Sequence, residues 1–190
     1  TAGGDCIADE VRVADGVSGT LQGDGGDIRL EGGLVGTAGG SAESVDFDAG
    51  SGDVVIGSAV SGIDDLSIQS ATDASFQSVA LTGDFITNSR LAGALDFSGA
   101  VSAGRVDVSA VTLLLNDGIS ASNDLGIDTT TGADLRGAIT AGDSISIAGP
   151  LDLAGDIESV SGGVMFGEHG RLSSDASITA HAGLVQANDN

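Results

Sequence analysis

The sequence contains no lysine, tryptophan or tyrosine, and it has one cysteine, one proline and five phenylalanines. A chain with so few bulky aromatic side chains cannot fill a wide interior, so we expect a narrow core of small aliphatic residues. The single cysteine, Cys6, excludes an internal disulfide and leaves the redox compartment undecided. No apolar run approaches the roughly 18 residues of a membrane-spanning helix, so no membrane insertion is expected.

Positive charge is also scarce, because the six basic residues are all arginines and stand against 28 acidic residues. The formal net charge is -22. Binding to nucleic acid or to an anionic lipid surface requires clustered Lys and Arg, so we expect neither kind of partner. Ten of the 23 aspartates lie directly beside Gly or Ser, a setting typical of solvated turns.

What the sequence does contain is a repeat with a period of about 20 residues. The repeated pattern is an apolar residue, three mostly small or polar residues, and a second apolar residue. It occurs as "VADGV" from Val13, "LEGGL" from Leu30, "IGSAV" from Ile56, "FSGAV" from Phe97, "LNDGI" from Leu115, "LRGAI" from Leu135 and "LAGDI" from Leu153. "FQSVA" from Phe76 is a weaker copy, and "LSSDA" from Leu172 is a degenerate one.

A second recurring piece lies between these copies, and it alternates apolar and small residues. Its copies are "VDF" at Val45, "LSI" at Leu66, "FIT" at Phe85, "VDV" at Val106, "LGI" at Leu125, "ISI" at Ile145 and "VMF" at Val164. A period of two predicts strands with one buried face. Gly and Asp recur too often to leave room for a helix.

Each unit is therefore expected to hold two or three strands of three to five residues, too few to enclose a core alone. Stacked units pair in parallel and align their apolar positions. We predict an all-β protein with a right-handed parallel β-helix of about nine coils, each of about 20 residues. Residues 1–190 form one domain, with N-terminal coils in 1–35, an inserted Gly/Ser-rich loop at 36–44 and regular coils in 45–190.

The stretch "LDFSGAV" shows how one coil is expected to bend. Phe97 and Val101 point inward on two adjacent faces, and Ser98, Gly99 and Ala100 form the corner, where a larger side chain would clash or face water. Rival solenoids fit less well. Leucine-rich and hexapeptide rhythms are missing, and the calcium-binding nonapeptide pattern occurs once, at 22–30, with Arg29 at its buried position.

Strings such as "LDFSGAVSAGRVDVSA" and "ADLRGAITAGDSISIAGPLDLAGDI" resemble the repeat regions of filamentous haemagglutinin-like and autotransporter-type adhesins. The resemblance covers roughly residues 45 to 183. It implies a β-helical shaft displayed outside a bacterial cell, with a role in adhesion, aggregation or biofilm formation. Asp replaces much of the Asn found in the turns of that family.

Two groups of residues deserve consideration as sites. His169 and His181 are twelve positions apart, which places them on different faces of a coil of about 20 residues, so we expect exposed histidines rather than a shared metal site. Clustered carboxylates are the more serious enzymatic candidates, because glycoside cleavage uses two of them at a defined separation. The candidates are the pair Asp46 and Asp48, the pair Asp64 and Asp65, and the series Asp107, Asp128 and Asp152.

The sequence thus predicts a non-catalytic, extracellular shaft or filament-forming surface protein, with no catalytic or cofactor-binding residues. A carbohydrate-active or carbohydrate-binding β-helix is the alternative, and an ice-binding solenoid ranks last because "TTT" at 129–131 is isolated. No cofactor is expected. Calcium between coils stays open, with no ligand set to name. The terminal coils present open strand edges, so the expected partners are an identical chain stacked end to end or the continuation of a longer chain, with a host or neighbouring cell surface as a further partner.

Overall fold

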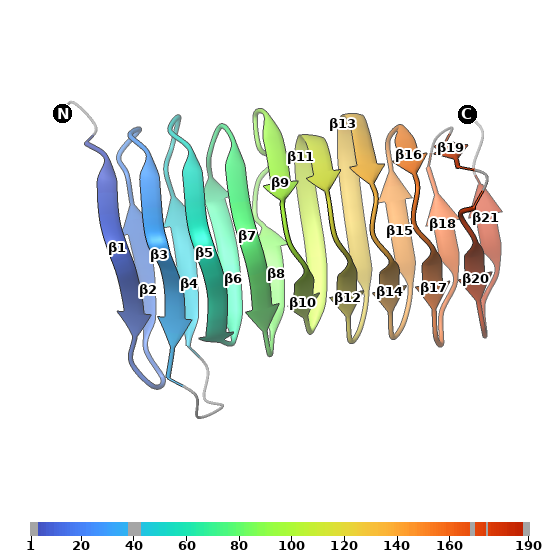
Figure 1. The fold of residues 1–190 in the computed structure, drawn as a ribbon, viewed down its shortest axis with the longest axis horizontal. Helices are drawn as coiled ribbons and strands as arrows, with labels where there is room; N and C mark the ends of the chain where they lie inside the picture. Colours follow the sequence, from blue (N-terminus) through green and yellow to red (C-terminus); the bar gives the residue numbers. More distant parts are fainter. Residues whose placement is uncertain (1–3, 38–42, 168–169, 174, 188–190) are drawn as a thin grey trace.

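The computed structural model in Figure 1 describes residues 4–37, 43–167, 170–173 and 175–187. Every regular element in these ranges is a β-strand, so they contain no helix that could cross a membrane. The 21 strands of the described residues are joined by parallel pairings between neighbouring coils, and a strand of an inner coil pairs with the strands one coil before and after it. These pairings form three ladders along the long axis of the molecule.

Ladder 1 contains one strand segment from each coil. Equivalent residues of neighbouring coils pair in it, as Ile28 does with Val54 and Leu135 with Leu153. Its strands are the first part of β1 (Cys6–Val13), β3 (Ile28–Gly36), β5 (Val54–Ile63) and β7 (Ala74–Leu81), then β9 (Ala94–Phe97), the last part of β11 (Arg105–Leu115) and of β13 (Leu125–Leu135), β16 (Leu151–Leu153) and β19 (Gly170–Leu172).

Ladder 2 continues from the corner that follows ladder 1. It is formed by the last part of β1, β3, β5 and β7, followed by β10 (Val101–Ala103), β12 (Ile119–Ala121), β14 (Ile139–Ala141), β17 (Ile157–Ser159) and β20 (Ile178–Ala180). Ladder 3 closes each coil. It contains β2 (Ser18–Gln22), β4 (Ser44–Asp48), β6 (Asp65–Ser70), β8 (Asp84–Thr87), the first part of β11 and of β13, β15 (Ile145–Ala148), β18 (Val164–Phe166) and β21 (Val185–Ala187).

The chain makes about nine turns of this coil, which confirms the predicted β-solenoid. In Figure 1 the front strands such as β3 and β5 run downward and the rear strands such as β4 and β6 run upward, while the chain advances from left to right. This sense of rotation is right-handed, as predicted. We number the coils 1 to 9 from the N-terminus.

Both repeated sequence patterns form columns of stacked residues, as the period required. The starts of the five-residue pattern from Leu30 onward align in ladder 1, and even the degenerate copy at Leu172 pairs with Leu153. The alternating pieces from Val45 to Val164 align in ladder 3. Like residues therefore stack on like residues through the interior.

Three details of the prediction were wrong. The copy at Val13 does not stack on Leu30, because Val13 ends β1 and pairs with Gly36, while Leu30 pairs with Ala8. In the weak copy from Phe76 the inward residue of ladder 2 is Val79 rather than Ala80. Strands are also longer than three to five residues where the backbone passes a corner without breaking, as in β11, which has 11 residues.

The interior is narrow and lined almost wholly by aliphatic side chains, with four phenylalanine rings in coils 2 to 5 and a fifth, Phe166, in coil 8. Phe76 lies at the centre of this group, because its ring centroid is 6.4 Å from that of Phe47, 5.4 Å from that of Phe85 and 5.7 Å from that of Phe97. Phe76 and Phe97 are stacked partners in ladder 1, and Phe47 and Phe85 reach them from ladder 3. The rings thus tie two ladders together across the core.

The corner between ladders 1 and 2 confirms the interpretation of "LDFSGAV". Phe97 and Val101 are buried on successive ladders. A Cβ atom added to Gly99 would lie 2.3 Å from the carbonyl oxygen of Gln77 in the preceding coil. Glycine is needed there because the two backbones approach too closely for any side chain.

Candidate functional site

The first candidate pair, Asp46 and Asp48, lies on the outer surface of β4 in ladder 3. Each carboxylate accepts a hydrogen bond from a serine hydroxyl of the next coil, Asp46 from Ser67 and Asp48 from Ser70. Asp46 also accepts one from the side-chain amide of Gln69 at 3.3 Å. Both carboxylates of the pair therefore bond to the next coil, and Asp46 also lines a hollow of about 160 Å³ together with Asp65 and Asp84.

The second pair, Asp64 and Asp65, lies at the corner where ladder 3 begins. Asp64 accepts a hydrogen bond from the Thr82 hydroxyl at 2.6 Å, and Asp65 accepts one from the backbone N–H of Asp84 at 2.7 Å. Both donors belong to the following coil. This pair has the same structural role as the first.

These bonds belong to a pattern that recurs at the corners of the solenoid. At the corner before ladder 1, an aspartate carboxylate in one coil accepts a hydrogen bond from a backbone N–H in the next coil. The donors and their acceptors are Asp27 to Asp5, Asp53 to Asp27, Asp73 to Asp53 and Ala94 to Asp73, at 2.6 to 3.2 Å. Asp124 and Asp156 do the same at the other two corners. Where the ladder is interrupted, the carboxylate supplies an acceptor that the backbone lacks.

Two of these aspartates show the electrostatic consequence of the pattern. The hydrogen bond from the N–H of Asp53 lowers the pKa of Asp27, and the guanidinium of Arg29 at 2.6 Å lowers it further. The hydroxyl and backbone N–H of Ser177, both on Asp156, lower the pKa of that carboxyl. Both groups stay ionised at neutral pH, which suits a hydrogen-bond acceptor and not a general acid.

The series Asp107, Asp128 and Asp152 is not brought together. Asp107 and Asp128 lie on the outer surface of ladder 3, where they pair with Arg105 and Arg90. Arg90 also donates to the Ser109 hydroxyl at 3.1 Å, so it connects positions 38 residues apart in the sequence. Asp152 lies instead on ladder 1, in β16.

The histidines form no shared site in the described part of the chain. His169 lies outside the described residues. His181 follows β20 in coil 9, and its Nε2 is 2.7 Å from Oε1 of Glu158 in coil 8, with both side chains about half exposed. The contact connects the last coil to the preceding one.

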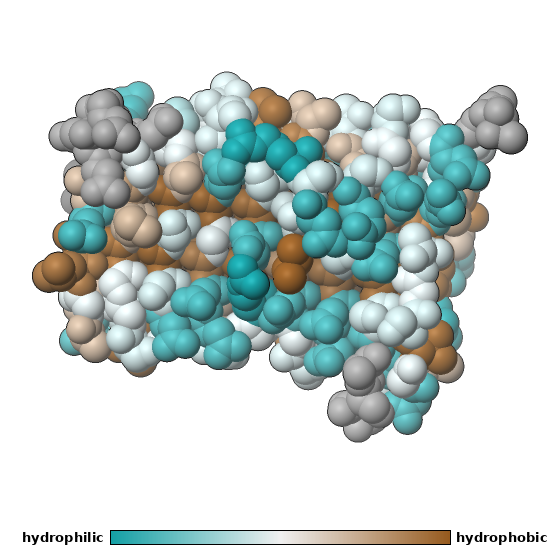
Figure 2. Space-filling view, turned by 180° about the vertical axis from the view of Figure 1, so that it is seen from behind, coloured by the Kyte–Doolittle hydropathy of each residue, from teal (hydrophilic) through white to brown (hydrophobic). Residues whose placement is uncertain are grey.

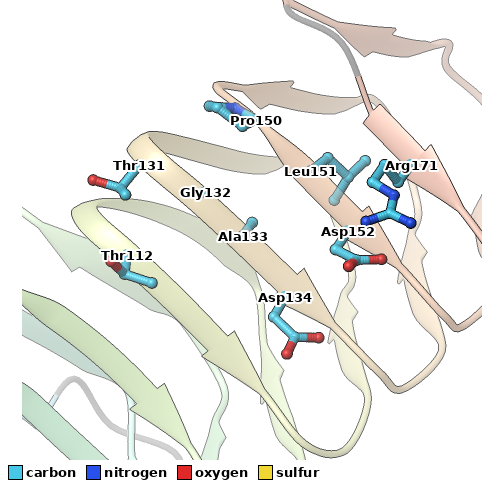
Figure 3. Close-up of a pocket in the computed structure, with 9 residues that line it drawn as sticks. All are labelled: Thr112, Thr131, Gly132, Ala133, Asp134, Pro150, Leu151, Asp152 and Arg171. Atoms are coloured by element: carbon cyan, nitrogen blue, oxygen red, sulfur yellow. The ribbon is translucent and has the colours of Figure 1, made fainter.

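A shallow hollow with a volume of about 390 Å³ lies over ladder 1 in coils 6 to 9. Figure 3 shows Asp134, Asp152 and Arg171 on three successive strands along it, with Thr131, Gly132 and Pro150 at the corner above. The register aligns Asp134 with Asp152 and Asp152 with Arg171. Sequence reasoning missed Asp134 and Arg171, although their spacing from Asp152 by one repeat was a usable signal.

One of the carboxylates that line this hollow, Asp134, is held in an ion pair. Arg136 donates to both carboxylate oxygens of Asp134, at 2.8 to 3.2 Å. This hydrogen bonding to Asp134 raises the pKa of Arg136, and the charge of Asp152 contributes. No group of three or more His, Cys, Asp or Glu side chains in the described ranges is arranged to hold a metal ion.

The opposite surface carries a smaller hollow of about 160 Å³ over β4, β6 and β8, with Asp46, Asp65 and Asp84 in its lining. Figure 2 shows the side of the molecule that presents ladder 3, where apolar rows run along the long axis between small and hydrophilic residues. The hydrophilic side chains form several groups over this side. The outward row of ladder 2 is small and flat, with Ser61, Ala80, Ser102, Ser120 and Thr140 on successive coils.

Comparison with known proteins leaves the fold as the principal finding. No protein-family model matches the chain, and no curated protein or solved structure matches it significantly.

Proposed function

We propose that this chain is a structural and adhesive shaft of an extracellular surface protein, without catalytic activity. The observation that carries the proposal is the continuity of the three ladders from coil 1 to coil 9. A solenoid of this kind gains stability from each neighbouring pair of coils, so it forms a stiff rod whose length grows with the number of repeats.

The use of the acidic side chains supports the same proposal. The pairs at 46 and 48 and at 64 and 65 bond to the next coil, and several further aspartates accept backbone N–H groups at corners. The high acid content therefore has a structural explanation that needs no substrate. The extracellular location and the adhesive role rest on the resemblance of the repeats to haemagglutinin-like adhesins.

A binding experiment tests the adhesive part of this proposal. The purified 190-residue chain, labelled at its amino terminus, is expected to bind bacterial or host cell surfaces saturably, and unlabelled chain is expected to compete. A small-angle scattering profile of the same sample is expected to fit an elongated rod. A compact globular profile, or cell binding that unlabelled chain does not reduce, would contradict the proposal.

The hollow over ladder 1 favours a second function, carbohydrate binding or cleavage. Asp134 and Asp152 are ladder partners that line this hollow, so it contains two carboxylates on neighbouring strands, and glycoside cleavage uses two carboxylates. Release of reducing ends from a polysaccharide panel, abolished by both Asp134→Asn and Asp152→Asn, would support this function. The bidentate pairing of Asp134 with Arg136 makes it the weaker candidate, because a carboxylate held in this way is a poor proton donor.

A further inference from the structure

The dipeptide Asp–Gly occurs three times in the sequence, at 15–16, 24–25 and 117–118. An aspartate carboxyl can react with the backbone nitrogen of the following residue, and glycine hinders this reaction least because it has no Cβ. Asp24 and Asp117 are both exposed, and both lie at corners between strands. The structure nevertheless gives the glycine nitrogens that follow them different partners.

The nitrogen of Gly25 is bonded to a neighbouring coil. Its N–H donates to the carbonyl oxygen of Ala49 in coil 2 at 3.1 Å, and the N–H of Gly26 closes the turn on the carbonyl of Gly23 at 2.8 Å. The φ angles of Asp24 and Gly25 are 47° and 90°, which fixes the turn in a left-handed conformation. The Gly25 nitrogen therefore has to leave its place in the solenoid before it can reach the Asp24 carboxyl.

The nitrogen of Gly118 is instead turned toward the aspartate before it. Gly118 lies at the corner between β11 and β12 in coil 6, and its N–H donates to Oδ1 of Asp117 at 2.8 Å. This is the only hydrogen bond of that N–H within the described residues. Cγ of Asp117 is bonded directly to Oδ1, so the nitrogen and the carboxyl carbon are already arranged for closure of a five-membered ring.

We propose that Asp117 is a site of spontaneous backbone isomerisation. The Gly118 nitrogen attacks Cγ of the protonated Asp117 side chain, the N–Cγ bond forms, and Oδ2 leaves as water with its own proton and the amide proton. The product is a cyclic imide. Water then adds to the imide carbonyl that came from the main chain, and the bond from this carbon to nitrogen breaks.

The final product is an isoaspartate, whose main chain passes through Cβ and Cγ and whose former main-chain carbonyl is a free carboxylate. The two steps release one water and consume one, so the reaction needs no oxidant, reductant or enzyme. It leaves the mass of the chain unchanged. It goes beyond the proposed shaft function and does not depend on it.

The coils on both sides make this corner sensitive to such a change. A Cβ atom added to Gly137 in coil 7 would lie 2.1 Å from the main-chain carbonyl carbon of Asp117, so the two backbones are in close contact. In coil 5, the N–H of Val101 donates to the carbonyl of Gly118 at 2.9 Å. An extra main-chain carbon and a new carboxylate at this point should loosen the stacking of coils 5, 6 and 7.

Oxygen-18 labelling tests the site. The folded chain is incubated at mildly acidic pH in water enriched in oxygen-18, at a temperature below its unfolding transition, and hydrolysis of each imide leaves one heavy oxygen. Trypsin in ordinary water then cleaves after Arg105 and Arg136 and releases residues 106–136. Electron-transfer dissociation locates the label and the isoaspartate. Label should accumulate at Asp117 at least about tenfold faster than at Asp24, because only the Gly118 nitrogen is arranged for attack.

Two controls separate the effect of the structure from that of the dipeptide. In concentrated urea, which removes the different bonds of Gly25 and Gly118, label should enter Asp24 and Asp117 at similar rates. Asp117→Glu keeps the charge but would require a six-membered ring, so position 117 should take up no label in the folded chain. Amide exchange at Val101 should increase in the aged parent chain and stay unchanged in the aged variant.

Equal labelling of Asp24 and Asp117 in the folded chain, or no label at Asp117, would overturn the proposal. Label at Asp117 that leaves amide exchange at Val101 unchanged would confirm the modification and overturn its expected effect on stacking. None of these measurements involves cell binding, so a failure here is distinguishable from a failure of the shaft function.

Discussion

The same residue types behave differently in coil 8 and in coil 9, although they occupy the same columns. Leu153 is fully buried and its ladder partner Leu172 is 54 % exposed, and Val164 is buried while its partner Val185 is 50 % exposed. Nothing in the local sequence distinguishes the members of each pair. A coil in the interior of the solenoid has a neighbour on both sides, and the last described coil has one, so burial depends on stacking and not on the repeat itself.

The phenylalanine rings of coils 2 to 5 pack on rings of other coils, so a substitution among them is expected to cause the largest loss of stability. Phe76→Ala should destabilise the chain by about 3–5 kcal/mol, because it removes a buried ring that contacts three others and leaves a cavity between two ladders. Urea denaturation followed by circular dichroism measures the loss. A change below about 1 kcal/mol would show that the narrow core collapses around the deletion.

The pair Leu153 and Leu172 tests the comparison directly. Leu153→Ala should cost about 2–5 kcal/mol, whereas Leu172→Ala should cost about 0.5 kcal/mol or less, because the side chain at 172 is already half in water. Thermal and urea unfolding should be recorded at protein concentrations low enough to avoid association. Equal losses for the two variants would mean that coil 9 is covered in solution.

Two glycines extend the comparison between inner and outer coils to backbone packing. Gly142→Ala should destabilise the chain by about 1–3 kcal/mol, since its Cβ would lie 1.9 Å from the carbonyl oxygen of Ser122 in the previous coil. Gly19→Ala, in coil 1, should be neutral or slightly stabilising, because no atom lies within 4 Å of its added Cβ and an alanine restricts the unfolded chain. Denaturation midpoints for the two variants should shift in opposite directions or differ clearly in size.

The smallest expected effect concerns the attachment of coil 9 to coil 8. The pKa of Asp156 is lowered by its bonds from Ser177, so this contact stabilises the fold fully above the ordinary value of 3.8 and is lost as the pH falls below it. Amide protection in β20, corrected for intrinsic exchange rates, should therefore decrease between pH 5 and about pH 2 in the parent chain.

Asp156→Asn is the control for this titration. It removes the ionisable group, so protection in β20 should be lower at pH 5 and should change less with pH. Protection that falls equally in both chains would assign the pH dependence to other carboxylates.

How far the sequence predicted the molecule can be judged from particular residues. The period placed Phe97 and Val101 on adjacent buried ladders correctly, because a coil that stacks on copies of itself must repeat its apolar positions. It misplaced Val13, because the five-residue pattern in coil 1 begins at the end of ladder 2, and the residue of coil 1 that aligns with Leu30 is Ala8, which is not part of the pattern. The acidic candidates were identified as residues, but their partners one coil away were not, since a hydrogen bond across about 20 positions depends on register.

By itself, the sequence determined the all-β class, the coil length and the identity of the inward columns, because these follow from periodicity and from the shortage of bulky side chains. Only the tertiary structure decided which carboxylates bond to the next coil, which ones meet in the hollow at Asp134 and Asp152, and which apolar residues stay exposed at the ends. The physical reason is that these properties belong to pairs of coils, and a single repeat carries no information about the neighbour that completes it.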